Sequence, residues 1–198
     1  ITANKALLAE RGKDIDKLLS KTGKNINYEA SVGGGIPIIG TIRDSILINN
    51  ILSFQGIMNG TCNYVLSLMS KKIEFQDAIK AAQKAGFAES DSTLDINGKD
   101  TAHKVVVLCK TCFGLDVKLK DMFIEGIENI TSYDLDCSEK LGYKIKLLGI
   151  GRIINNHLDA RVHPALVRQD NPLANVDNEF NAILVNSKNL GPFMSYGY

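Results

Sequence analysis

The sequence has 198 residues, 44% of them apolar, so it can bury one substantial core, or one domain and part of another. Its 23 basic and 22 acidic side chains are mixed along the chain, which argues against a nucleic-acid-binding stripe or a polybasic membrane contact. Apolar stretches fall far short of the roughly 20 residues that cross a bilayer, and the first residues lack a signal-peptide pattern, so we expect a cytoplasmic protein that handles a small molecule.

The first third of the chain predicts alternating helices and strands. Apolar residues at helical spacing predict two short helices over residues 4–22, broken at Gly12. Residues 26–30 predict a strand, which the tight glycine turn SVGGGIP follows. A second strand is expected over residues 52–57, and then a helix for which Thr61 is a suitable N-cap.

The remainder of the chain continues this alternation. The expected elements are a helix over 75–85 ended by Gly86, a helix over 99–113 ended by Gly114, a β-hairpin of 143–154 and 157–167 joined at Asn155-Asn156, and a last strand over 180–186. Interleaved helices and strands predict the α/β or α+β class, with a mixed β-sheet covered by helices.

Two cysteines, Cys109 and Cys112, have the spacing of a zinc-binding or redox pair. Both fall on the apolar face of the expected helix over 99–113, and no second Cys or His pair accompanies them. Buried reduced thiols are common packing residues, so we expect these two to pack in the core.

An acidic stretch, ESDSTLDINGKDTAHK, spans residues 89–104 and ends on a lysine. Its charged residues of interest are Glu89, Asp91, Asp95, Asp100 and Lys104. Asp100 and Lys104 are one helical turn apart and share a strip with Val107, which suggests that the strip is not open to water. The pair is either a weak exposed ion pair or part of a charged pocket in which carboxylates bind a substrate ammonium and the lysine exchanges protons. Spacing alone does not decide between the two.

The turn SVGGGIP is equally open to two interpretations. Three glycines after a strand form either a plain tight turn or a place where backbone approaches a ligand closely. No GxGxxG fingerprint, P-loop or Ser/His/Asp ordering occurs in these residues.

Several long motifs together carry a family resemblance. They are TANK at residues 2–5, YEASVGGGIPII at 28–39, GIMNGTCNYVLS at 56–67, AQKAGFAESDSTLDINGKDTAHK at 82–104 and LGYKIKLL at 141–148. In this order they resemble homoserine dehydrogenase over nearly the whole chain. The resemblance implies NADPH- or NADH-dependent reduction of L-aspartate 4-semialdehyde to L-homoserine, in the pathway that leads to threonine, methionine and isoleucine.

The resemblance also implies roles for individual residues. Lys104 would be the acid/base and Lys5 the second catalytic lysine, near the nicotinamide. The amino-acid substrate would be bound by Glu89, Asp100, Asp95 and Thr61, and the NADP or NAD cofactor would contact Lys5, Gly86, Asn59 and Gly60. A sodium or potassium ion would be bound, mainly by backbone carbonyls, at Glu29, Val32, Gly34 and Ile36.

The domain organisation follows from the same resemblance. Residues 1–24 would be a remnant of a Rossmann nucleotide-binding domain, and residues 25–198 the catalytic, substrate-binding and homodimerisation domain. The phosphate-binding loop would precede Ile1, so these residues alone are expected to be an inactive dimeric fragment. A catalytically silent dimerisation or regulatory module is the alternative, but it has no need for Lys5, Glu89, Asp100 and Lys104 together.

Overall fold

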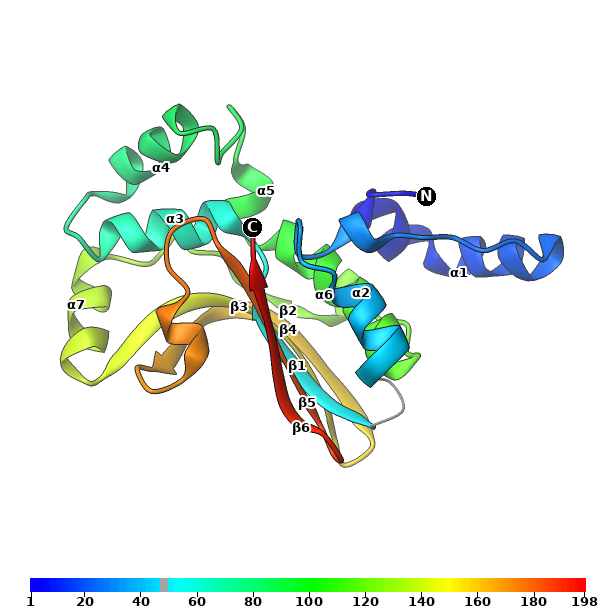
Figure 1. Ribbon diagram of the computed structural model, residues 1–198. Coiled ribbons are helices and arrows are strands. Elements are labelled where there is room, and N and C mark those ends of the chain that lie inside the picture. Colours follow the sequence, from blue (N-terminus) through cyan, green and yellow to red (C-terminus); the bar gives the residue numbers. More distant parts are fainter. Residues whose placement is uncertain (47–49) are drawn as a thin grey trace.

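The computed structural model describes residues 1–46 and 50–198 and contains a six-stranded sheet with helices layered on one face (Figure 1). The strand order is β2-β4-β3-β1-β5-β6, and neighbouring strands are antiparallel except β2 and β4. The strands are β1 Ile51–Ile57, β2 Phe123–Ile124, β3 Tyr143–Ile154, β4 His157–Arg168, β5 Asn181–Ser187 and β6 Gly191–Gly197. The expected class, a mixed sheet covered by helices, is confirmed.

The helices supply the covering layer and most of the residues considered below. They are α1 Lys5–Thr22, α2 Ile38–Thr41, α3 Gly60–Met69, α4 Phe75–Lys84, α5 Thr93–Ile96, α6 Lys99–Phe113 and α7 Ser132–Lys140, with shorter turns η1 Glu29–Ser31, η2 Ile42–Ile46, η4 Leu119–Asp121 and η5 Pro172–Asn175. Helix α6 packs on β3 and β4, and the main core lies between the helices and the sheet. A smaller apolar cluster lies on the other face, under η5.

The hairpin of β3 and β4 forms as the sequence predicts. Asn155 and Asn156 have φ angles of 50° and 63°, which a two-residue hairpin turn requires and which asparagine tolerates better than most residues. The register then runs without interruption from Ile154 opposite His157 to Tyr143 opposite Arg168. This strand pair is the part of the sheet on which α6 packs.

One local prediction is wrong and one is displaced by a residue. Residues 26–30 are not a strand: residues 26–28 have no regular secondary structure, residues 29 and 30 belong to η1, and one backbone hydrogen bond joins Thr2 N to Asn27 O at 2.9 Å. A segment becomes a strand only when a partner pairs along it, and no such partner lies beside it in the described chain. The break expected at Gly12 is found one residue earlier, at Arg11 (φ −118°, ψ 17°), where a kink divides α1 into two helical parts.

The cysteines pack as predicted. All four are free thiols, and Cys109 and Cys112 are buried on the core side of α6. Burial raises the pKa of Cys109 to about 12, so its thiol stays protonated. Within residues 1–46 and 50–198, no group of three or more His, Cys, Asp or Glu side chains is arranged to bind a metal ion. None of the described helices combines the length and apolarity that crossing a membrane requires.

Candidate active site

A cleft of about 270 Å³ is lined by residues at the N-terminal parts of α3 and α6 and by the residue that follows β6. Its lining comes from several separate parts of the chain: Asn59, Gly60, Thr61, Phe87, Asp95, Asp100, Lys104, Glu179, Asn181 and Tyr198. Six of these were predicted as site residues, five of them for the substrate or the cofactor and Lys104 for catalysis. The fold therefore brings most of the predicted set into one place.

Lys104 and Asp100 form the centre of this cleft. The Lys104 Nζ donates to Asp100 Oδ2 at 2.7 Å and to the backbone oxygen of Met58 at 2.5 Å. The side chains of Lys104 and Asp100 are only 16% and 10% exposed, so the weak exposed pair that the spacing also allowed is not what forms. Lys5, from the first turn of α1, reaches the other oxygen, Asp100 Oδ1, at 3.0 Å. One buried carboxylate thus joins the two lysines that the resemblance pairs.

Asn59 connects this pair to a second carboxylate. Its Nδ2 donates to Asp100 Oδ2 at 2.9 Å and to Asp95 Oδ1 at 2.7 Å. Its Oδ1 accepts from the backbone N of Cys62, so Asn59 is the N-cap of α3 and the expectation that Thr61 is the cap was wrong. The cap accounts for this: since Oδ1 is held by the helix, the amide can direct only its NH₂ group toward the acids. The Thr61 hydroxyl instead donates to the Phe87 carbonyl at 2.6 Å.

The two carboxylates differ in their electrostatics. Burial by itself would raise the pKa of Asp100, but the charge and hydrogen bond of Lys104, with Asn59 and Lys5, outweigh it and lower that pKa. Burial raises the pKa of Asp95, which has only partial compensation from the Asn59 hydrogen bond and is repelled by Asp100. A cation that entered the cleft beside Asp95 would therefore gain a carboxylate that is short of positive partners.

Four cleft residues were not predicted as site residues: Phe87, Glu179, Asn181 and Tyr198. The Tyr198 hydroxyl donates to a Glu179 carboxylate oxygen, and both residues line the cleft together with Asp100 and Lys104 of α6. Gly60 allows this wall to approach, because a Cβ there would lie 2.6 Å from the Glu179 carbonyl oxygen. The available signal was weak: two polar residues flank Phe180 just before a strand.

Three of the residues predicted for catalysis, substrate or cofactor lie outside the cleft lining: Lys5, which reaches Asp100 from α1, Gly86 and Glu89. Gly86 and Glu89 are exposed on the connection between α4 and α5, and Glu89 follows the lining residue Phe87 by two positions. Gly86 has a φ of +81°, which fits its predicted place at the end of a helix. Their roles stay predictions.

The predicted cation turn has a distinctive backbone. Gly33 and Gly34 have φ angles of +81° and +61°, and the Glu29 carboxylate caps α2 by accepting from the backbone N of Ile39 and Gly40 at 2.8 and 2.7 Å. Glu29 could therefore offer a cation its carbonyl more readily than its side chain. Val32 is completely buried, and its carbonyl accepts no hydrogen bond from the described residues.

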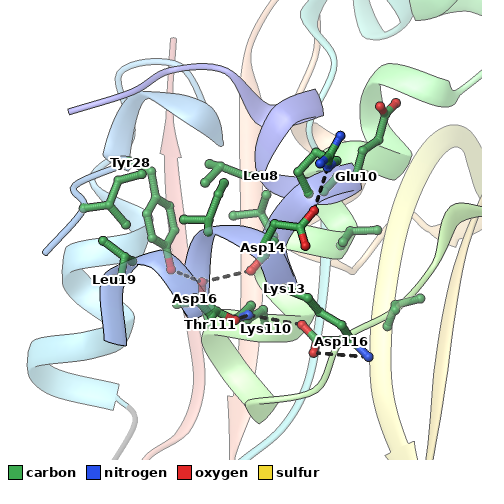
Figure 2. Close-up of a pocket in the computed structure, with 18 of the residues that line it drawn as sticks. Leu8, Glu10, Lys13, Asp14, Asp16, Leu19, Tyr28, Lys110, Thr111 and Asp116 are labelled. Carbon is green, nitrogen blue, oxygen red and sulfur yellow. Dashed lines mark hydrogen bonds and ion pairs between the residues drawn. The ribbon is translucent and has the colours of Figure 1, made fainter. Parts of the chain in front are cut away.

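A larger groove of about 700 Å³ lies between α1 and α6, away from the cleft (Figure 2). Its charged side chains largely satisfy one another: Lys110 binds both Asp16 and Asp116, and the Tyr28 and Thr111 hydroxyls lie 3.3 Å apart. These contacts hold α1 against α6. The groove is larger than the cleft but contains none of the predicted site residues.

Comparisons with known proteins agree on one family. A family model described as homoserine dehydrogenase matches residues 37–198. The chain is 43% identical over 198 residues to a homoserine dehydrogenase of Neisseria gonorrhoeae, covering all of this chain and 46% of that protein. A homoserine dehydrogenase of Methanocaldococcus jannaschii is 42% identical over 185 residues, 93% of this chain and 54% of that protein.

The structure gives the same result. It matches the crystal structure of a homoserine dehydrogenase from Thiobacillus denitrificans with a TM-score of 0.96 at 43% identity, covering 99% of this chain and 46% of that one. It matches that of the Staphylococcus aureus enzyme with a TM-score of 0.86 at 38% identity, covering 99% and 46%. The chain thus spans about half the length of the relatives that it matches.

Proposed function

The chain belongs to the homoserine dehydrogenase family, and on that premise we propose that its cleft binds L-homoserine or L-aspartate 4-semialdehyde and interconverts them. The observation that carries the proposal is the arrangement of Lys104, held between Asp100 and the Met58 carbonyl, beside a second carboxylate, Asp95. The Lys104 ammonium can give a proton to a reacting oxygen, and Asp95, which has few positive partners, can bind an ammonium of the substrate.

Lys104 would move the proton in this reaction. In the reducing direction its ammonium gives a proton to the aldehyde oxygen, and in the oxidising direction its amine takes the proton of the homoserine hydroxyl. Asp100 would keep Lys104 oriented and protonated between turnovers. Lys5 would bring a second positive charge close to the reacting oxygen of the substrate. Asp95 would bind the substrate ammonium together with Asp100 and Glu89, and Thr61 would line the same pocket.

A nicotinamide cofactor, NADP or NAD, would supply or accept the hydride. We propose that Lys5, Asn59, Gly60 and Gly86 form this chain's share of its site. The backbone N–H groups of Gly60 and Thr61 at the start of α3 donate to no described residue, and such free N–H groups suit the carbonyl or phosphate oxygens of this kind of cofactor.

We also propose a sodium or potassium ion at the glycine turn, bound by the carbonyls of Glu29, Val32, Gly34 and Ile36. The buried Val32 carbonyl, which accepts no hydrogen bond from the described chain, supports this, because a hard cation binds carbonyl oxygens well.

A homodimer is proposed through the face of the sheet that the helix layer leaves open. Apolar side chains on that face, including Ile150, Ala165 and Met194, are only partly buried beside the cluster under η5. A two-fold axis would allow two copies to cover this face mutually.

Substrate analogues test the proposal in the full-length native chain. With NADP or NAD, L-homoserine should be oxidised, and 4-hydroxybutyrate, which lacks the ammonium, should have a kcat/KM roughly 10- to 150-fold lower, because a lost charged hydrogen bond costs roughly 1.5–3 kcal/mol. Asp95→Asn should reduce the ratio of kcat/KM for homoserine to kcat/KM for 4-hydroxybutyrate, because the substrate ammonium loses one of its carboxylate partners. Absence of homoserine oxidation, or equal use of both compounds, would refute the proposal and favour a silent module.

A further inference from the structure

A buried lysine lies outside the proposed reaction. The Lys146 side chain, on β3, is only 3% exposed and lies on the face of the sheet opposite the main helix layer. Its Nζ donates to Val176 O at 2.6 Å, to Asp177 Oδ1 at 2.8 Å and to Asn63 Oδ1 at 3.2 Å. An ammonium has three donors, so every proton of this group has an acceptor. A lysine is rarely buried to this extent without a specific partner.

Asn63 extends this arrangement to helix α3. Its Nδ2 donates to the carbonyls of Val176 and Phe180 at 3.0 and 3.1 Å, while its Oδ1 accepts from Lys146. One turn further along α3, Ser67 Oγ accepts from the backbone N of Asn178 at 2.9 Å. The segment 176–180, which is neither helix nor strand, is thus attached at three points to α3 and β3.

This segment carries a wall of the cleft. Glu179 lines the cleft directly, and the segment leads into Asn181, which lines it as well. Asn59, one turn before Asn63 on α3, binds Asp95 and Asp100, which line the cleft as well. The distance from Glu179 to these two acids therefore depends on how the segment is held against α3, and Lys146 provides a charged contact that does so.

We propose that Lys146 is a positioning residue, which holds segment 176–180 so that Glu179 stands at a fixed distance from Lys104 and Asp100. The inference rests on the proposed function, because it assigns the Glu179 wall to substrate binding. Lys146 itself does not contact the substrate in this role. Lys146 acts on the reaction through Glu179 alone, so its effect must disappear when Glu179 can no longer contribute.

A double-mutant cycle in the full-length native chain tests this. Lys146→Met and Glu179→Gln should each raise the KM for homoserine by about tenfold, with kcat within about threefold, because Lys104 and its partners do not touch the segment. The double variant should be no worse than either single variant. Multiplying effects, or an unchanged KM in Lys146→Met or Glu179→Gln, would overturn the proposal.

Lys144→Met is the matched control. Lys144 is on the same strand and the same face, and it contacts the same carboxylate through Asp177 Oδ2 at 3.2 Å, but it is 37% exposed and binds neither Val176 nor Asn63. Its KM should stay within about twofold of the wild-type value. If Lys146→Met does not fold, Asp177→Asn takes its place and should show a smaller rise in KM with the same dependence on Glu179.

Hydrogen exchange separates failure of this inference from failure of the proposed function. The Asn178 amide should exchange at least about tenfold faster in Lys146→Met than in Lys144→Met, whether or not homoserine is the substrate. Equal exchange in the two variants would overturn the positioning role. A wild-type protein inactive on homoserine would refute only the proposed function.

Discussion

Replacing Lys104 with Met should remove both a proton donor and a structural ion pair. The change deletes two short hydrogen bonds, to Asp100 and to the Met58 carbonyl, from a side chain that is 16% exposed. Hydrogen bonds that involve a charge contribute about 1.5–3 kcal/mol each, and Asp100 keeps Asn59 and Lys5 as partners, so we expect a loss of about 2–4 kcal/mol in the free energy of unfolding. Turnover should fall by about two to four orders of magnitude.

Lys104→Arg is the matched control for this change. Arginine keeps the positive charge beside Asp100 but does not release its proton near neutral pH. The Arg variant should therefore retain most of the stability and lose turnover to about the same extent as the Met variant. Denaturant unfolding and steady-state kinetics on the same preparations measure the two effects separately.

The dependence of stability on pH gives a further check. In the wild-type protein the lowered pKa of Asp100 contributes stability that is present above the ordinary Asp pKa near 3.9 and is lost as pH falls through the folded value. Without Lys104 the opposing effect of burial is less compensated, so this gain should disappear in Lys104→Met. Near-normal turnover in either variant, or an unchanged acid limb of stability in Lys104→Met, would refute the reasoning.

Other predictions concern positions around the site and in the core. Gly60→Ala should lower the free energy of unfolding by about 1–3 kcal/mol despite the better helix propensity of alanine, because its Cβ would lie 2.6 Å from the Glu179 carbonyl; unchanged denaturant unfolding would contradict this. Thr131→Ala should cost about 1 kcal/mol by removing the capping box of α7, with Tyr133→Ala, an exposed change, as the neutral comparison. The buried Cys109 thiol, whose pKa is raised to about 12, should resist alkylation at pH 8 while the half-buried Cys137 reacts first; peptide mapping showing the reverse order would contradict the packing role.

The parts of the fold that the sequence predicts well are those set by local chemistry. The paired asparagines specify the turn of the β3–β4 hairpin, and the apolar spacing of α6 specifies its buried face. Helix α7 was missed although its capping box, Thr131 with Asp134, is visible in the sequence, because few of its side chains are apolar. Strand β6 contains Gly and Pro and is a strand because it pairs along β5.

The candidate site divides along the same line. Helical spacing was enough to place Asp100 and Lys104 on one strip, and Val107 correctly indicated that the strip is not exposed. Spacing carries no information on contacts between distant segments, so Lys5 entered only through the family resemblance. Neither the spacing nor the resemblance indicated Glu179, because its place in the cleft is produced by the packing of α3 against the segment before β5.

The Asn59 amide uses its oxygen to cap α3 and its NH₂ group to bind two acids, and this double use limits which residues can replace it. Serine, threonine or aspartate would cap α3 equally well, but the hydroxyls lack an NH₂ group for two acids, and aspartate would add a third negative charge beside Asp95 and Asp100. Glutamine keeps the amide but is one methylene too long for the cap. Several residues at this position would stabilise the N-terminus of α3. Asparagine is the one that also donates hydrogen bonds to both acids. Saturation mutagenesis scored for folding should therefore accept several residues at this position, whereas the same library scored for turnover should accept asparagine alone.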